Sequence, residues 1–246
     1  MPQDSKAKTA KEQVTLSRWQ LNLFTECPRC FWLLNRHGVK QPKGFPMALN
    51  IAMDQLLKAE FDEYRAAGTL PPVLAEQGVQ ATLFQDTEQL AEWRNNFRGL
   101  RWKDPKTGHT LYGAVDDILE FPDDSLAVVD YKSSGAKEAT IYPSYQLQMD
   151  VYTYLLQRLG YRTAPKAYLA FFMAVKDDGF KGRLPFRAQF LEISPEPDRV
   201  HDLFRRAVAL AQSDDEPEPG AECDLCRWYG EATPLVGGTK PRMCVD

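Results

Sequence analysis

Two aspartates and a lysine stand at the ends of two adjacent segments that the sequence predicts to be strands. Asp116 closes the run Gly113-Ala-Val-Asp116, and Asp130 and Lys132 lie in Val129-Asp-Tyr-Lys132. A Pro-Asp-Asp-Ser turn over residues 122–125 predicts a hairpin, which brings the two carboxylates together. Hard divalent cations prefer oxygen ligands, and Mg²⁺ typically takes one or two protein carboxylates and keeps water or phosphate oxygens. The pattern therefore predicts a divalent-metal site.

Strand alternation adds the lysine to this site. Side chains alternate with a period of two, so Lys132 lies beside Asp130, and Tyr131 and Asp117 point the other way. A lysine next to a bound metal can orient an attacking water or neutralise developing negative charge. The alternative interpretation is that these charges protect a strand edge. The metal site is favoured because strands disfavour aspartate and these acids sit among Val, Ile and Leu, where an unpaired carboxylate is costly.

Four of the five cysteines form two C-x-x-C pairs at opposite ends of the chain, Cys27 with Cys30 and Cys223 with Cys226. Paired spacing and an odd count, in a sequence without a secretion signal, favour metal ligation over disulfides. Four thiolates suffice for structural Zn²⁺ or a [4Fe-4S] cluster, and either would clamp the N-terminal helical region to the C-terminal tail. Cys244 is interpreted as a free tail thiol, with a replacement ligand as the alternative.

The elements that must position these groups follow from periodicity and breakers. Helices are predicted from Thr15 with an interruption at Pro28, over 47–67, 88–97 and 143–159, and over 199–212; strands are predicted over 79–84, 110–121, 126–132, 166–175 and 186–193. This order predicts an α/β fold with a central mixed β-sheet flanked by helices. We divide the chain into a disordered lead (1–14), an N-terminal helical region (15–76), a core (77–212) and a linker with a Cys-bearing tail (213–246).

Composition places the chain among ordinary globular proteins. Of its 246 residues 43% are hydrophobic and 26% charged, and the net charge of -4 gives no general basic surface for nucleic acid. No apolar run approaches the roughly 20 residues that a spanning helix needs, and the start carries no apolar signal core. We therefore expect no membrane association and a cytoplasmic location.

A further segment is both basic and aromatic. It contains Arg94, Arg98, Arg101 and Lys103 together with Trp93, Phe97 and Trp102. Such a segment can stack bases and hold phosphates. A helix end that packs its aromatic residues inward explains it equally well, and the sequence does not separate the two interpretations.

Three elements in this order resemble the PD-(D/E)XK nuclease superfamily, and specifically its RecB-like branch: Gly113-x-x-Asp116, Asp130-x-Lys132 and Gln148-x-x-x-Tyr152. The resemblance implies a restriction-endonuclease-like core and a Mg²⁺- or Mn²⁺-dependent deoxyribonuclease, by analogy an exonuclease on single-stranded DNA. It also implies that Asp116, Asp130 and the carbonyl of Tyr131 bind metal. Lys132 would then position or activate water. Gln148 and Tyr152 are one helical turn apart, so both can face the metal site, and they would guide the DNA strand.

The sequence departs from that family at an upstream helix, where members often carry a metal-binding histidine. The matching residues here are Asp54 and, one helical turn later, Lys58. Asp54 is a candidate oxygen ligand in place of the histidine. Its alternative interpretation is a solvated helix residue.

The Cys27-Pro-Arg-Cys30 start, followed by Phe31-Trp-Leu, resembles the iron–sulfur subset of RecB-type nucleases, which includes CRISPR-associated exonucleases and the helicase-nuclease AddB. Those proteins usually use one N-terminal and three C-terminal cysteines, whereas this chain offers two and two. The resemblance favours [4Fe-4S] and leaves Zn²⁺ open. Two rival functions are a non-catalytic nucleic-acid-binding module and a partner subunit of a helicase or of a DNA repair or defence complex.

Overall fold

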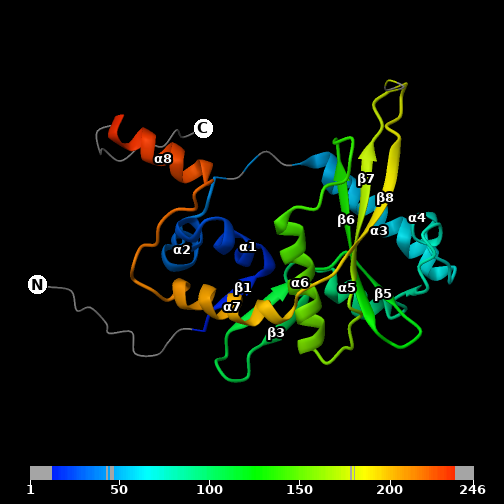
Figure 1. The fold of residues 1–246 in the computed structure, drawn as a ribbon, viewed down its shortest axis with the longest axis horizontal. Coiled ribbons are helices and arrows are strands. Elements are labelled where there is room, and N and C mark those ends of the chain that lie inside the picture. Colours follow the sequence, from blue (N-terminus) through cyan, green and yellow to red (C-terminus); the bar gives the residue numbers. More distant parts are fainter. Residues whose placement is uncertain (1–12, 43, 45–46, 178, 180, 236–246) are drawn as a thin grey trace, which may run out of the picture.

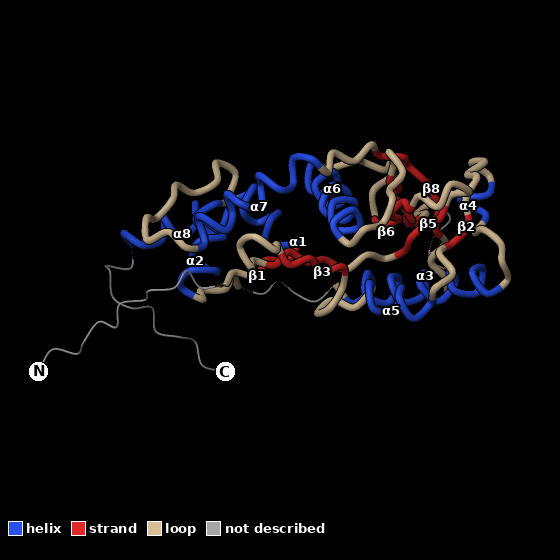
Figure 2. Tube along the Cα trace, turned by 90° about the horizontal axis from the view of Figure 1, so that it is seen from below, coloured by secondary structure: helices blue, strands red, loops and turns tan. Residues whose placement is uncertain are grey.

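The computed structural model describes residues 13–42, 44, 47–177, 179 and 181–235. Most of the predicted disordered lead and the predicted free thiol Cys244 lie outside these residues. The described elements form an elongated α/β molecule, with a five-stranded sheet toward one end and the helices that carry the cysteines toward the other (Figure 2).

The larger sheet is mixed, as the sequence predicts. Its order is β2-β5-β6-β7-β8, and β6 and β7 run parallel whereas the other neighbours are antiparallel. The strands are β2 (Thr82–Leu83), β5 (Asp117–Glu120), β6 (Leu126–Ser134), β7 (Ala167–Ala174) and β8 (Phe186–Ile193). The nine-residue β6 lies at the centre, and its first six residues are buried because helices cover both faces of the sheet.

The two faces of β6 bury different clusters (Figures 1 and 2). Val129 and Tyr131 face α3 (Ala48–Ala66) and the short α4 (Pro72–Ala75). Val128 packs in the other cluster, with residues of α6 (Pro143–Arg158). The alternation of apolar residues along β6 therefore places Asp130 and Lys132 on the α6 side. The remaining helix near this sheet is α5 (Thr87–Trp93).

A second, three-stranded sheet was not predicted. It has the order β1-β4-β3, formed by β1 (Thr15–Ser17), β4 (Thr110–Gly113) and β3 (Leu100–Lys103). The predicted helix at Thr15 is wrong for its first residues, which pair in parallel with β4. Helix α1 (Arg18–Glu26) begins only after Ser17, whose side chain forms a capping box with Gln20. The predicted strand over 110–121 is split into β4 and β5, and Asp116 lies in the gap.

The two ends of the described chain meet. Pro28 ends α1 as predicted and occupies the first turn of α2 (Pro28–His37), which packs near α7 (Asp198–Ala211). The segment after α7 is fastened to α2: Trp32 Nε1 donates to the carbonyl of Ser213 over 2.9 Å, and Arg29 Nε donates to that of Pro217 over 3.1 Å. Helix α8 (Asp224–Leu235) follows and was not predicted.

Candidate active site and cysteine centre

The two predicted acids meet at the end of the β5–β6 ladder. The pairing of Asp117 with Val129 places the next residues, Asp116 and Asp130, opposite each other. The backbone N–H of Tyr131 donates to Asp116 Oδ2 over 3.0 Å. Asp130 is 2% exposed, and burial, followed by the charge of Asp116, raises its pKa to about 7 against the lowering effect of Lys132. The structure therefore brings the two carboxylates into one site.

Lys132 and two residues of α6 surround Asp130, as the sequence predicts. Lys132 Nζ forms an ion pair with Asp130 Oδ2 and donates to Gln148 Oε1 over 3.0 Å. Gln148 Nε2 in turn donates to Asp130 Oδ1 over 2.7 Å and to the hydroxyl of Tyr152, one helical turn away, over 3.1 Å. Burial alone would lower the pKa of Lys132, but the charges of Asp130 and Asp116 outweigh it and raise that pKa. The ammonium is therefore protonated at neutral pH.

A buried ionic network on the opposite face of β5 was missed by sequence reasoning. Asp117 is fully buried and accepts hydrogen bonds from Arg65 Nη2 at 2.7 and 2.8 Å, from Arg94 Nη2 at 3.0 Å, and from the Tyr131 hydroxyl at 2.7 Å. Arg94 Nε also donates to the backbone carbonyl of Asp116 over 2.7 Å. The network thus holds the backbone of Asp116 in place. The feature of the sequence that could have indicated this network is the adjacent pair Asp116-Asp117.

The basic-aromatic segment divides between the two interpretations. Trp93 is buried and stacks on Phe84, and Arg94 is held in the Asp117 network. Phe97, in contrast, is 84% exposed. The inward-packing explanation therefore holds for the first part of the segment.

Asp54 reaches this site through a lysine. Lys58 Nζ lies 2.9 Å from Asp54 Oδ2 and 3.0 Å from Asp116 Oδ1, so its ammonium bridges the helix α3 and the first acid. Sequence analysis placed Asp54 and Lys58 on one face of the helix, and the structure confirms that placement. The contact between Lys58 and Asp116 was not predicted.

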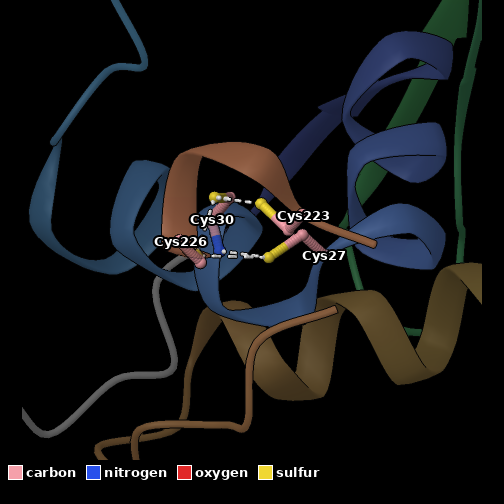
Figure 3. A group of neighbouring side chains, drawn as sticks. All are labelled: Cys27, Cys30, Cys223 and Cys226. Carbon is pink, nitrogen blue, oxygen red and sulfur yellow. Dashed lines mark hydrogen bonds between the residues drawn. The ribbon is translucent and has the colours of Figure 1, made fainter. Parts of the chain in front are cut away.

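The four paired cysteines converge, as predicted. Their Sγ atoms all lie within 4.8 Å of one another, with separations of 3.7 Å for Cys27–Cys226, 3.7 Å for Cys30–Cys223 and 3.5 Å for Cys30–Cys226 (Figure 3). The backbone N–H groups of Gly220 and Cys30 donate to Cys27 Sγ. Burial works against these bonds, but the net effect lowers the pKa of Cys27 to about 7. Such a cluster can bind a metal ion.

Residues 46–230 match the PD-(D/E)XK nuclease superfamily. The chain belongs to this superfamily. A solved structure of SSO0001 is 15% identical, with 92% of this chain and 88% of that chain covered and a TM-score of 0.44. A search of curated proteins finds no match.

Superfamily membership gives the acid site a chemical meaning. PD-(D/E)XK nucleases use divalent metals and act on nucleic acid, so the family supports a metal-dependent phosphodiester hydrolase. The donor set fits such an ion, because Asp116 and Asp130 bring hard carboxylate oxygens together in a partly buried site. Among the described residues, no helix of this nuclease-superfamily chain is long and apolar enough to cross a membrane.

Proposed function

We propose that the chain is a Mg²⁺- or Mn²⁺-dependent deoxyribonuclease, and that it acts as an exonuclease on single-stranded DNA, as its RecB-like motifs imply. One observation carries the catalytic part of this proposal. Asp116, Asp130 and Lys132 lie in a single network at the end of β5 and β6, with Asp130 buried beside the lysine. This is the arrangement that metal-assisted phosphodiester hydrolysis needs.

The metal ligands in this proposal are Asp116, Asp130 and the carbonyl of Tyr131. In an extended strand the N–H and C=O of one residue point to the same side. Because the N–H of Tyr131 binds the Asp116 carboxylate, its carbonyl also points toward Asp116 and away from β7. A bound divalent ion would polarise the scissile phosphate and lower the pKa of an attacking water.

The other residues act by charge and position. The raised pKa of Lys132 keeps it protonated, which supports a role in orienting water and stabilising negative charge rather than one as a base. Gln148 holds both Asp130 and Lys132, and Tyr152 holds Gln148. Since Gln148 and Tyr152 are buried, their contacts support the positioning of the acid and lysine, and a role in guiding DNA stays a prediction.

The test is cleavage of labelled single-stranded and double-stranded DNA with Mg²⁺ or Mn²⁺, with end-labelled and circular substrates to separate exonuclease from endonuclease action. We expect wild-type protein to degrade linear single strands and Asp130→Asn to lose at least about 100-fold in rate. A wild-type protein that binds DNA and never cuts it would favour the rival function, a non-catalytic binding module. Stable association with a helicase and no DNA affinity alone would favour a partner subunit.

We also propose that the cysteine centre holds a single Zn²⁺, the alternative that sequence analysis left open beside [4Fe-4S]. Four thiolates at ~2.3 Å from a tetrahedral ion stand about 3.8 Å apart. Three of the six Sγ separations, at 3.5 to 3.7 Å, are close to that value, and all six are within 4.8 Å. A four-iron cluster inserts its irons and sulfides between the thiolates, which must then stand further apart.

Metal analysis of anaerobically purified protein tests this assignment. We expect about one zinc per chain and no absorption near 400 nm, and Cys226→Ser should lose the zinc. About four irons per chain together with that absorption band would establish [4Fe-4S] instead.

A further inference from the structure

Lys58 places a positive charge between two carboxylates at the proposed metal site. Its Nζ lies 2.8 Å from Asp54 Oδ1, 2.9 Å from Asp54 Oδ2 and 3.0 Å from Asp116 Oδ1. The side chain of Lys58 is 23% exposed and that of Asp116 19%. The ammonium of Lys58 therefore stands on the side of Asp116 that faces α3.

In two-metal nuclease sites a second ion stands beside the first and stabilises one of the reacting oxygens. Such an ion would need carboxylate oxygens on the α3 side of Asp116, where Asp54 and Asp116 supply them. Here the bridging position on Asp116 Oδ1 is filled by Lys58, and Asp116 Oδ2 accepts the Tyr131 N–H. A second divalent ion between Asp54 and Asp116 would have to displace the ammonium, against its attraction to both acids. Asp130 differs, because Lys132 pairs with its Oδ2 and the ion-pair contact of Lys132 is with this one acid, so an ion at Asp130 would displace an ammonium held by a single carboxylate.

The charge balance points the same way. The acids Asp54, Asp116 and Asp130 face the cations Lys58 and Lys132, and the charge of Arg18 also acts on Asp130. With Asp130 ionised, as binding of a cation requires, the three negative and three positive charges cancel. The two positive charges of one divalent ion would then balance a phosphodiester and an attacking hydroxide, which carry one negative charge each. A second divalent ion would leave an excess of two positive charges in a partly buried site.

We propose that Lys58 takes the place of a second metal ion, so that this chain is a one-metal nuclease in which the ammonium bridges Asp54 and Asp116. This inference rests on the proposed function. It assigns Asp54 to hold Lys58 rather than to bind metal. Lys58 is thus a positioning residue that acts on the proposed ligand Asp116 and limits the number of bound ions.

The test is the stoichiometry of Mn²⁺ binding to the full chain with its cysteine centre loaded, measured by calorimetry and by electron paramagnetic resonance. We expect wild type to bind one Mn²⁺. Lys58→Met keeps the aliphatic stem and removes the charge, so it should gain a second Mn²⁺ with the spectrum of a spin-coupled pair and bind it at least tenfold more tightly than wild type. Lys58→Arg, which keeps the charge, should bind one ion.

A matched control removes a lysine charge elsewhere. Lys166 Nζ lies over the ring of Phe121, 4.8 Å from its centroid, so Lys166→Met should leave one bound ion. Two ions on wild type, or a single ion on Lys58→Met, would overturn the Lys58 proposal and leave the proposed nuclease intact. If no variant binds Mn²⁺, the metal-dependent function itself is wrong.

Discussion

The backbone N–H of Tyr131 donates to the carboxylate of Asp116 over 3.0 Å, and the hydroxyl of the same residue donates to Asp117 over 2.7 Å. One residue of β6 therefore holds two successive aspartates whose side chains have opposite tasks. Asp116 is part of the candidate active site, and Asp117 is the buried counter-charge that Arg65 and Arg94 share. The stability of the fold, through Asp117, and the geometry of the candidate active site, through Asp116, thus both depend on contacts of Tyr131.

Asp117 is predicted to be required for stability. The substitution Asp117→Asn removes the buried negative charge that pairs with Arg65 and Arg94. Arg65 is only 3% exposed, so water cannot replace that partner. Breaking a buried ion pair on one side typically costs about 3–5 kcal/mol, so the free energy of unfolding in urea should fall by that amount. Asp62 contacts the same two arginines but its side chain is 49% exposed, so Asp62→Asn should cost about 0–1 kcal/mol. Equal losses in the two variants would contradict this account.

Gly113 is predicted to be needed for close packing against Tyr152. A Cβ at Gly113 would stand 2.6 Å from Tyr152 Cε1 and 3.2 Å from Arg18 Cβ. Gly113→Ala should therefore cost about 1–3 kcal/mol of stability and lower the cleavage rate, because a shifted Tyr152 pulls on Gln148 and so on Asp130. Gly135→Ala is the control, since its added Cβ would meet only the flexible end of Lys176 at 3.5 Å. A Gly113→Ala variant with full stability and activity would disprove the packing argument.

The pH dependence of stability should reveal Asp130 in the metal-free protein. The folded-state pKa of about 7 lies above the ~3.9 of an unfolded aspartate, so the folded state binds this proton more tightly. The stabilising contribution of Asp130 is complete below the unfolded pKa and is lost as pH rises through about 7. Urea unfolding measured from about pH 4 to about pH 8, a range that spans the unfolded and folded pKa values, should show wild type losing stability relative to Asp130→Asn. Parallel profiles for the two proteins would refute the shift.

Gly220 is predicted to be essential for the cysteine centre. Its backbone approaches α1 so closely that an added Cβ would lie 1.9 Å from the carbonyl oxygen of Glu26. Its N–H also donates to Cys27 Sγ over 3.3 Å. Gly220→Ala should push the C-terminal pair away, reduce bound metal and lower the melting temperature. Gly230→Ala, with open space around the added Cβ, should keep its metal, and metal content measured by mass spectrometry compares the two.

Sequence reasoning was most successful where chemistry and local periodicity agree. Asp116, Asp130 and Lys132 were predicted to meet because a hairpin and strand alternation are local rules, and Gln148 and Tyr152 because they are one helical turn apart. The cysteine cluster was predicted from thiol spacing. The geometry confirms these placements, while the catalytic roles stay predictions.

The missed features depend on contacts between distant segments. Strands β1 and β3 have three and four residues, too few for a periodic pattern, and β1 pairs with a strand far along the chain. Lys58 meets Asp116 only because α3 packs across β6, and no local rule encodes that packing. Sequence reasoning gave Arg65 no role and placed Arg94 only in the basic-aromatic segment, because the burial of a basic residue cannot be read from its type alone.

The cysteine centre joins thiols that are 193 to 199 residues apart in sequence. During synthesis the first pair leaves the ribosome long before the second exists. The four-thiolate site can therefore be completed only after translation has passed Cys226, and a chain that stalls or is truncated earlier keeps two reactive thiols without their partners. Loading of the proposed zinc would therefore mark the chains whose translation has passed Cys226.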